Sequence, residues 1–449
     1  MGSPEPLGAV KHFTWKELSA LNKRENAHVA HNGKVYDVSS FVSSHPGGVD
    51  QIMLGAGHDI THLFNVYHQP QTMKVLEKYY VGELIDNEMP VYAEDKTQFY
   101  PVLKKRVKEH FKSLNIDPKI DYRMFSLYLF FLFFWVSSWY GMLRYHDSWL
   151  GVACSFALGW CSCFVLFNFG HDLSHFAITH KPWIWKVGGF ITVVMGGFSM
   201  YCWTYQHTYG HHNYTNVNGV DPDTKTNDID FWRIKHKQNW IKRYRLQYIY
   251  MPMLYCFLAI KMKMQDFSDI LSLQKGTIRM NPPSTFQLIK FYVAKFLHFS
   301  LVLFIPMMIM PLKTLILYHF IYELVYGFIT ALITVVNHVN TDLAEIQPDE
   351  TNDKKWAEYQ VLTTKDYATD SLLCTLLTGA LNHQVAHHLF PDVLQSYYPI
   401  ITPIVRDTCK EFGIQYNCET SFLTVVKEHL IFLFKMGQEP AATQYNKEQ

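Results

Sequence analysis

Histidines are concentrated in three short stretches of this 449-residue chain, and imidazole is a side chain well suited to holding a transition metal. The stretches read HDLSH at 171–175, HTYGHH at 207–212 and HQVAHH at 383–388. Histidines four residues apart lie on one face of a helix, so each stretch can direct several ring nitrogens to one point. One tetrahedral ion takes four ligands, whereas two adjacent six-coordinate ions use seven or eight and keep positions open for oxygen. A single stretch would favour structural histidines, but three together predict a site for two metal ions.

Four apolar runs must position these histidines, because each has the roughly 20 residues that a membrane-spanning helix needs. The runs cover residues 124–143, 150–169, 291–310 and 314–335. They form two hairpins, and basic residues gather outside them at 104–108 and 242–245. The positive-inside rule therefore predicts that both termini and the long middle segment lie in the cytosol. This topology brings all three histidine stretches out on the same side of the membrane.

A fifth apolar segment, 183–200, contains Lys186 and four glycines. If it crossed the membrane, it would separate the first histidine stretch from the second. We therefore expect this segment to lie in or on the membrane interface.

Charge and cysteine usage exclude other classes of protein. The chain has 40 Lys and Arg against 39 Asp and Glu, and its net charge of +1 predicts no nucleic-acid partner. Of eight cysteines, the only close pair is Cys161 and Cys163, which fall inside an apolar run. Neither a disulfide framework nor a zinc finger is indicated.

A soluble unit precedes the first apolar run. Residues 11–84 mix charged, aromatic and turn residues, 85–97 form a polar linker, and 98–435 make up the membrane part. The first unit contains YDVSSFVSSHPGG at 36–48 and FNVYHQP, which carries His68. It resembles the haem-binding domain of cytochrome b5, whose HPGG histidine and a later histidine clamp haem iron from both faces. The resemblance implies that His45 and His68 bind haem b, which then transfers electrons and does not bind oxygen.

Two other histidines of this unit, His58 and His62, compete for the second position on the haem. They rank below His68 because the family's spacing and aromatic lead-in favour His68. The glycines after His45 suit a tight turn, since glycine tolerates backbone angles and close approaches that other residues do not.

The order of motifs along the chain resembles that of the front-end membrane fatty acyl desaturases. These proteins carry an N-terminal cytochrome b5 domain and have glutamine in place of the first histidine of the third box, which here is Gln384 in QVAHHLFP. The resemblance extends over about residues 11–435. It implies a multi-domain fold: a small α+β cytochrome b5-like haem domain, then an all-α desaturase domain of four transmembrane helices with a cytosolic helical cap.

The resemblance also implies a set of ligands for two non-haem irons, namely His171, His175, His207, His211, His212, His387 and His388. His338, in VVNHVNTD after the fourth apolar run, fits an additional histidine of this family. The alternative for His338 is an interfacial histidine at a helix end. Gln384 would contact a metal directly, through water, or by a hydrogen bond to a ligand. His383 could serve as a substitute ligand, but we expect its ring to point away.

Acidic residues near the boxes are expected to orient the histidines. They are Asp172 in HDLSH and Asp221 and Asp223 in GVDPDT, with a helix cap and a solvated turn as the structural alternatives. Asp172 and Gln384 are the candidates for a catalytic role beyond metal binding.

The implied reaction is an O2-dependent desaturation of polyunsaturated fatty acyl chains. Removing hydrogens from unactivated methylenes requires a strong oxidant, which two ferrous ions generate from O2 when electrons arrive one at a time. The haem delivers these electrons. Their source is NADH through a separate NADH–cytochrome b5 reductase, because the chain has no GxGxxG nucleotide motif. The acyl substrate is a CoA ester or a phospholipid among the membrane lipids, and the expected location is the endoplasmic reticulum membrane.

The position of the new double bond is a finer question. HTYGHHNYTNV together with QVAHHLFP resembles delta-5 enzymes, although delta-6, delta-4 and sphingolipid delta-8 desaturases share the same scaffold. A fatty acid hydroxylase fused to cytochrome b5 would leave oxygen in its product. A non-enzymatic haem electron-relay protein is the alternative from another class, but it leaves the histidine boxes without a purpose.

Overall fold

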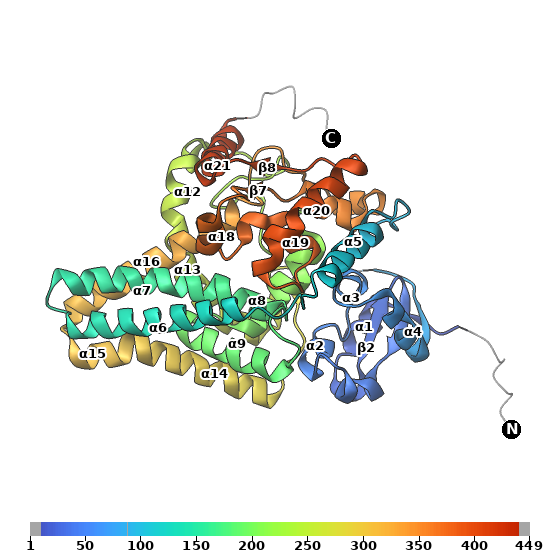
Figure 1. Ribbon diagram of the computed structural model, residues 1–449, viewed down its shortest axis with the longest axis horizontal. Helices are drawn as coiled ribbons and strands as arrows, with labels where there is room; N and C mark the ends of the chain where they lie inside the picture. Colours follow the sequence, from blue (N-terminus) through green and yellow to red (C-terminus); the bar gives the residue numbers. More distant parts are fainter. Residues whose placement is uncertain (1–9, 88, 440–449) are drawn as a thin grey trace.

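A four-stranded sheet organises the N-terminal part of the computed structural model, which describes residues 10–87 and 89–439 (Figure 1). The strand order is β1 (His12–Phe13), β4 (Tyr80–Leu84), β3 (Lys34–Asp37) and β2 (His28–His31). β1 pairs with β4 in parallel, and the other pairs are antiparallel. Asn32 and Gly33 connect β2 to β3 with φ angles of 48° and 75°, as a two-residue hairpin turn requires.

Short helices complete this N-terminal unit. They are α1 (Trp15–Ala20), α2 (Val49–Leu54), α3 (Thr61–Tyr67) and α4 (Met73–Leu76). A capping box fixes the start of α1, because Thr14 and Glu17 each bond the other's backbone N–H. Val29, Tyr36 and Phe64 are among the buried side chains that form the core between sheet and helices.

The segment expected to be a linker is attached to the rest of the protein. The backbone of Ala93 pairs with residues 354 and 355, and the hydroxyl of Thr351 donates to the Val91 carbonyl at 2.9 Å. The chain then enters α5 (Phe99–Ser113), which packs against α20 (Tyr398–Glu411). The N-terminal unit is therefore held on the helical part along this segment.

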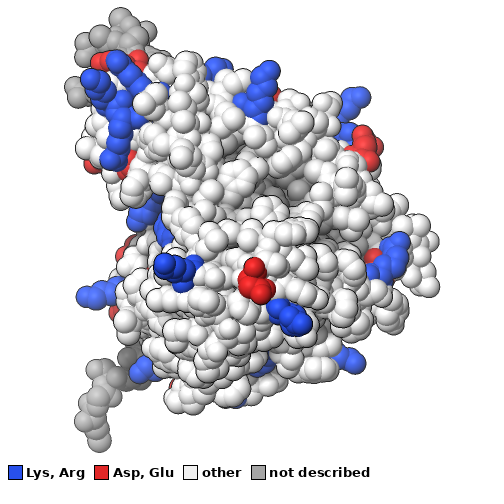
Figure 2. Space-filling model, turned by 90° about the vertical axis from the view of Figure 1, so that its left-hand side faces the viewer, with Lys and Arg blue, Asp and Glu red and all other residues white. Residues whose placement is uncertain are grey.

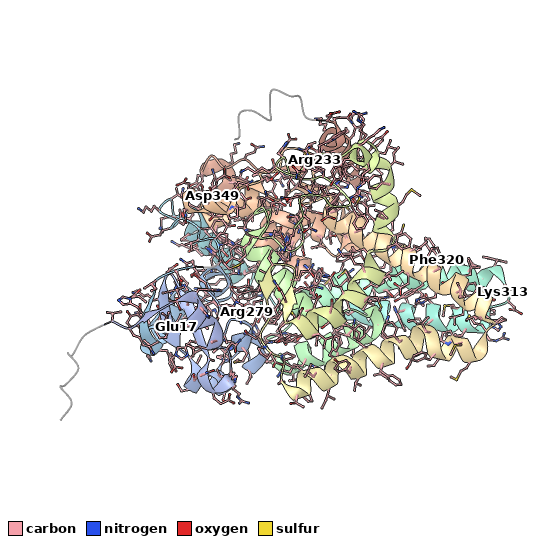
Figure 3. The ribbon with its side chains drawn as sticks, turned by 180° about the vertical axis from the view of Figure 1, so that it is seen from behind. Glu17, Arg233, Arg279, Lys313, Phe320 and Asp349 are labelled. Atoms are coloured by element: carbon pink, nitrogen blue, oxygen red, sulfur yellow. The ribbon has the colours of Figure 1, made fainter. Side chains whose placement is uncertain are left out.

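The expected apolar runs form helices long and apolar enough to cross a membrane. Among the described residues there are four: Tyr122–Arg144, Trp149–Ser174, Thr285–Ile309 and Leu312–Val335. In Figure 1 they extend side by side toward one end of the molecule as α6 (Tyr122–Arg144), α7 (Trp149–Val165), α14 (Thr285–Phe299), α15 (Ile305–Ile309) and α16 (Leu312–Val335). Figure 3 places Lys313 and Phe320 at this end, far from Glu17 of the N-terminal unit.

The outer surface of this helical bundle is apolar. Figure 2 faces the bundle end and shows wide areas that carry no Lys, Arg, Asp or Glu. Large side chains are exposed there, among them Phe133 and Met308, with exposed fractions of 71% and 77%. Contiguous apolar surface of this kind is suited to contact with lipid.

The ambiguous apolar segment forms a sharply bent pair of helices. α9 (Pro182–Gly196) and the stretch Met200–Tyr214, which begins with α10 (Met200–Trp203), meet at 109°, as in a broken span or a re-entrant loop. The bend needs a glycine at Gly197, where φ is +86° and a Cβ would lie 2.4 Å from Nε2 of His298.

The remaining elements form a helical cap over one side of the bundle (Figure 1). Its helices are α12 (Gln247–Tyr255), α13 (Leu258–Ser272), α17 (Trp356–Leu362), α18 (Leu372–Thr378), α19 (Gln384–Leu389), α20 and α21 (Phe422–Gly437). Two small strand pairs accompany them: β5 (Gln274–Lys275) with β6 (Ile278–Arg279), and β7 (Asp366–Tyr367) with β8 (Cys418–Glu419). The first two histidine boxes lie at the junction of bundle and cap, and α19 carries the third.

Candidate metal centre

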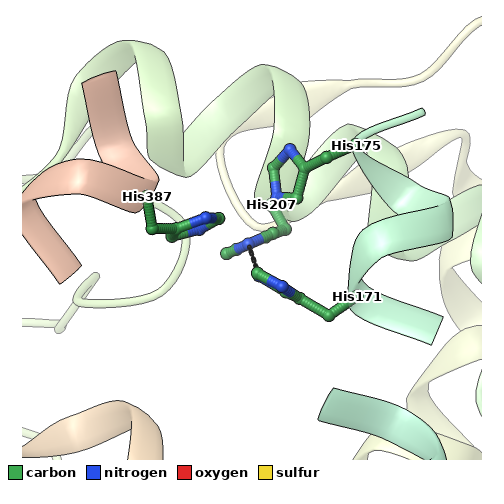
Figure 4. A group of neighbouring side chains, drawn as sticks. All are labelled: His171, His175, His207 and His387. Carbon is green, nitrogen blue, oxygen red and sulfur yellow. Dashed lines mark hydrogen bonds between the residues drawn. The ribbon is translucent and has the colours of Figure 1, made fainter. Parts of the chain in front are cut away.

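Rings from all three histidine boxes meet at one buried place. Figure 4 shows His171, His175, His207 and His387 directed toward one another from different segments, and one ligand atom of each lies within 4.8 Å of those of the others. The Nε2 atoms of His171 and His207 are 3.0 Å apart. Two nitrogens bound at right angles to one ion, with bonds of roughly 2.1 Å, would be about 3.0 Å apart. We call these four residues the first histidine group.

A second histidine group lies beside the first and consists of His211, His338 and His388. The Nε2 atoms of His211 and His338 are 3.3 Å apart, and the side-chain nitrogen of Gln384 lies 2.9 Å from Nε2 of His338. His212 lies between the groups. Its Nε2 is 3.3 Å from that of His207, and its ligand atom is within 4.8 Å of those of His387 and His388. All eight histidines predicted to be metal ligands are thus assembled at one place, seven of them in two adjacent groups and His212 between the groups.

A π-helical turn distributes the second box between the two groups. Residues Thr204–His211 form a π-helix, which closes with a bond from the backbone N–H of His212 to the carbonyl of His207. This wider turn brings the rings of His207 and His212 together and directs His211 to the second group. As predicted for histidines four residues apart, His207 and His211 share one helix face, with stacked rings whose centroids are 5.5 Å apart, but the helix is a π-helix and not an α-helix.

Buried ion pairs hold the bend that precedes this box. The Asp266 carboxylate accepts from the backbone N–H of Ser199 at 2.6 Å and from Lys295 at 2.7 Å. Lys295 also donates to the Gly197 carbonyl at 2.6 Å. These contacts join α13 and α14 to the turn between α9 and α10, and so fix the direction in which the second box leaves it.

The outer ring nitrogens of several histidines are bound by protein groups. The Nδ1 atoms of His211, His387 and His388 lie 3.0 Å from Asp221, 3.2 Å from the hydroxyl of Tyr398 and 2.8 Å from the side-chain oxygen of Gln360. Such contacts set the tautomer and direct Nε2 inward. In the described part of the chain, Nε2 of His175, His387 and His388 is buried without a hydrogen-bond partner. These unpartnered nitrogens fit a bound metal ion.

The imidazoles of His338, His387 and His388 are in the form that binds metals, whereas, against the lowering effect of burial, the carboxylates of Asp221 and Asp223 raise the pKa of His211 to about 9. Burial lowers the pKa values of His338, His387 and His388 well below the ordinary value, and neighbouring imidazoles lower them further. At neutral pH these rings are uncharged, and each offers a lone pair on the nitrogen that faces the centre.

The start of α19, which carries the third box, is held by a buried carboxyl group. Asp366 accepts from the backbone N–H of Val385 at 2.8 Å and also from the hydroxyl of Tyr416. Burial raises the pKa of Asp366 to about 7. One side chain thus joins β7, α19 and the segment before β8.

Asp172 does not have the contact that we expected. Its carboxylate accepts from the hydroxyl of Tyr128 at 2.8 Å, and this bond joins the first box to α6 rather than orienting an imidazole. Of the acidic residues, Asp221 makes the predicted contact with His211, and Asp223 lies 3.8 Å from Nδ1 of His207. The correction follows from helix geometry: Asp172 is next to His171 in sequence and so projects from a different face of the helix.

The side chains of the third box differ in direction. The oxygen of Gln384 is buried without a partner in the described structure, while its nitrogen contacts His338. His383 points away, since its two ring nitrogens contact the hydroxyls of Thr402 and Thr375 at 2.9 and 3.3 Å. Gln360 and Tyr398 were not predicted, because nothing in their spacing along the chain relates them to a histidine box.

His45 and His68 form a separate pair in the N-terminal unit. Their ring centroids are 6.1 Å apart, and each Nδ1 donates to a backbone carbonyl, His45 to Gly48 at 3.3 Å and His68 to Phe64 at 3.2 Å. Two imidazoles bound through Nε2 on opposite sides of one ion, with bonds of roughly 2.1 Å, would have centroids about 6.5 Å apart. A Cβ at Gly47 would lie 2.9 Å from the His45 ring, so a glycine is needed here.

The neighbouring histidines of this unit have other contacts. His58 packs on Tyr209 with a centroid distance of 4.7 Å, and His62 stacks on Trp356 at 5.4 Å.

Burial lowers the pKa of His68 to about 4 and also lowers that of His45, so that both are neutral. The pair His45 and His68 therefore fits an iron held between two imidazoles.

A cavity of about 620 Å³ lies between the N-terminal unit, α9 and α14. Its lining is mainly apolar and includes Leu173, Phe176, Trp185, Val193, Tyr205 and Phe291. Leu173 belongs to the first histidine box and Phe176 follows it, while none of the eight histidines is among the residues that line the cavity. Two lysines lie in the cavity wall, Lys290 and Lys186, and Lys186 forms an ion pair with Asp50 of the same wall at 3.0 Å.

Comparison with known proteins agrees with this arrangement. Residues 147–420 match the fatty acid desaturase family, and residues 14–85 match the cytochrome b5-like heme/steroid binding domain. The acyl-lipid (8-3)-desaturase of Mortierella alpina is 38% identical, over 96% of this chain and 98% of that protein. The delta(5) fatty acid desaturase A of Dictyostelium discoideum is 36% identical, over 96% and 95%. An sn-1 linoleoyl-lipid 6-desaturase of Synechocystis sp. is 28% identical, over 76% and 96%.

The chain belongs to the fatty acid desaturase family, whose members are membrane oxidoreductases. It is of the front-end type, with its own cytochrome b5 domain at the N-terminus followed by the helical desaturase domain. The family accounts for the two kinds of site, since a cytochrome b5 domain implies haem and a desaturase holds iron in its histidine clusters. The unpartnered Nε2 atoms of His175, His387 and His388 fit iron, and the facing rings of His45 and His68 fit haem.

We expect Asp221→Asn to reduce both the iron content and the rate of product formation by about 10- to 100-fold. The substitution removes the charge that holds the outer N–H of His211. Iron per protein after dialysis and product yield measure the effect. Asp228→Asn, in an exposed part of the same loop, is the matched control. Equal iron content in the two variants would contradict the role of Asp221.

Proposed function

We propose that this protein inserts a cis double bond at the delta-5 position of polyunsaturated fatty acyl chains carried on membrane lipids. The observation that carries the desaturase chemistry is the pair of adjacent histidine groups with unpartnered buried nitrogens. Delta-5 specificity rests on a different observation: the relatives with delta(5) and (8-3) names are 36% and 38% identical, against 28% for the 6-desaturase.

In this proposal, residues 11–84 are the haem domain, 85–97 the linker and 98–435 the desaturase domain. His45 and His68 hold haem b. The two histidine groups and His212 hold two irons, with Gln384 beside His338 in the second group. The free oxygen of Gln384 is available to a metal ion or to a bound water.

When bound, the two irons use O2, two electrons and two protons to convert a CH2–CH2 unit to CH=CH, with release of two waters, and the haem passes the electrons one at a time. The residues around the irons keep the ligands in place. Asp221, Gln360 and Tyr398 hold the outer nitrogens of His211, His388 and His387, so the rings do not rotate during turnover. Burial of all these side chains keeps water from the oxidising centre.

The apolar cavity lined by Leu173 and Phe176, from the region of the first histidine box, receives the acyl chain. Its apolar lining suits methylene groups, and Lys186 and Lys290 in its wall could contact the polar end of the chain. The names of the acyl-lipid relatives favour a lipid-linked acyl chain over a CoA ester.

Electrons come from NADH through a separate NADH–cytochrome b5 reductase. The protein lies in the endoplasmic reticulum membrane with both termini in the cytosol. The distribution of basic residues supports this orientation, since 104–108 and 242–245 lie outside the four apolar helices.

Expression of the full chain in yeast fed with polyunsaturated acids tests the specificity. We expect a new double bond at carbon 5 of an acid whose first double bond is at carbon 8, seen by gas chromatography with double-bond localisation. The His211→Ala variant, which lacks a proposed iron ligand, is the negative control.

The same experiment distinguishes the alternatives. A new bond at carbon 6 or 4, or at carbon 8 of a sphingolipid, would contradict delta-5 specificity but retain the desaturase chemistry. A hydroxylated chain would indicate a hydroxylase. Purified protein with one haem and no further iron would indicate an electron-relay protein.

A further inference from the structure

Tyr67 makes a direct connection between the two metal sites. It is the last residue of α3 and is followed at once by His68 of the haem pair. Its hydroxyl lies 3.1 Å from Nδ1 of His175, a member of the first histidine group. The Nε2 of His175 is buried and has no partner in the described structure. A single residue therefore separates the proposed haem ligand from a hydrogen bond to a proposed iron ligand.

This connection belongs to a firmly docked surface. The side chain of Lys104 in α5 donates to the carbonyls of Asn65 and His68, at 2.5 and 3.1 Å. The hydroxyl of Tyr209 donates to the Asp59 carbonyl at 3.2 Å. Both ends of α3 are thus held on the desaturase domain. The docking contacts therefore fix the position of Tyr67 relative to His175.

The Arg279 side chain adds a further contact between the domains. It donates to the Gly57 carbonyl at 2.6 Å, and Figure 3 shows Arg279 beside the haem domain. The neighbouring Asn281 donates to the carbonyls of Met53 and Ala56, each at 2.8 Å. The haem domain therefore has a defined orientation, with α3 toward the histidine groups.

We propose that Tyr67 is the positioning and electron-transfer residue that links the haem to the first histidine group. The proposal rests on the function proposed above. One electron passes from ferrous haem iron, which becomes ferric, to a ferric ion of the histidine site, which becomes ferrous. No bond forms or breaks, and Tyr67 itself is neither oxidised nor deprotonated.

The path consists of the His68 imidazole, the backbone between His68 and Tyr67, the Tyr67 side chain and one hydrogen bond to His175. Electron tunnelling weakens less steeply through covalent bonds and short hydrogen bonds than across empty space. With His175 bound to metal through Nε2, its Nδ1–H donates to the Tyr67 oxygen, which also fixes the ring.

A second contact of α3 offers a less direct path. His62 stacks on Trp356 with ring planes 11° apart, and Nε1 of Trp356 donates to the backbone carbonyl of His212 at 3.1 Å. On this path the electron must cross the space between the stacked rings of His62 and Trp356, and the path ends on a backbone carbonyl and not on an imidazole. If the electron followed this path, replacing Trp356 would slow electron transfer and replacing Tyr67 would not.

The test uses the full-length holoenzyme and the variants Tyr67→Phe, Trp356→Phe and Tyr80→Phe. Tyr80→Phe is the matched control, since it also removes a hydroxyl from the haem domain, but one that is bonded to Glu83. The haem is reduced beforehand, O2 and acyl substrate are added, and haem re-oxidation is followed by stopped-flow absorbance at equal iron content. Iron retention against a chelator and the haem potential are measured separately.

For Tyr67→Phe we expect haem re-oxidation and iron retention both to fall by about 10-fold or more, with unchanged haem absorbance and potential. Tyr80→Phe should match the wild type. A Tyr67→Phe rate equal to that of Tyr80→Phe at equal iron content would overturn the proposal, as would slowing confined to Trp356→Phe. A wild-type protein without haem or without iron would instead refute the proposed function.

Discussion

Replacing His211 by alanine should lower product formation by more than about 100-fold and leave the haem absorbance unchanged. His211 faces His338 in the second histidine group, and Asp221 holds its outer nitrogen. Loss of this ring removes a metal ligand from a buried site, where bulk water does not replace the missing imidazole. Product is measured by gas chromatography and iron by elemental analysis of the purified protein.

The control for His211→Ala is His180→Ala. His180 is exposed and bonded to Asp117, outside both histidine groups. We expect this variant to keep its iron and its activity. Desaturation by His211→Ala at the level of His180→Ala would remove His211 from the set of ligands.

Replacing His68 by alanine should abolish the haem absorbance, leave the iron of the desaturase domain in place, and lower product by more than about 100-fold. His68 is one of two imidazoles that face each other in the N-terminal unit, whereas the proposed iron ligands all lie in the desaturase domain. The iron site would then be intact but without a supply of electrons. Absorbance spectra, elemental analysis and product yield report the three quantities.

His12→Ala is the matched control for this experiment, because His12 is an exposed histidine of the same unit. It should retain haem and activity. Simultaneous loss of haem and iron in His68→Ala would show that the two sites do not fill independently. That result would contradict the separation of the sites between two domains.

The two variants together separate the roles of the two sites. His211→Ala should hold a reducible haem whose electrons have no acceptor, and His68→Ala should hold iron that receives no electrons. Re-oxidation of pre-reduced haem in His211→Ala should therefore be slow, and this measurement checks the direction of electron flow.

Several features could be predicted from local sequence. The four spanning helices follow from runs of about 20 apolar residues, since this length matches the thickness of the bilayer core. The expected haem ligands His45 and His68 follow from the resemblance that the HPGG motif and FNVYHQP carry. The three boxes indicated metal ligation through their residue types, and the rings do meet, although the four helices could have separated them.

Other features could not be read from local sequence, because they depend on partners distant in the chain. A π-turn assigns His207 and His211 to different groups, and nothing in HTYGHH distinguishes it from an α-helix. We predicted that Asp172 would orient an imidazole, because it is next to His171 in sequence. Its carboxylate instead accepts a hydrogen bond from Tyr128 of another helix.

Residue type and spacing along the chain were therefore enough to predict the histidine boxes and the spans, and the motifs carried the family resemblance that implies the ligand set, because each is a property of a short segment. Three features arise only when the segments pack together. They are the division of the ligands between two histidine groups, the contacts that hold the outer ring nitrogens, and the contact of Tyr67 with His175. The physical reason is that a hydrogen bond needs two groups within about 3 Å, and for these residues only the docking of the domains and the bend of α9 bring the groups so close.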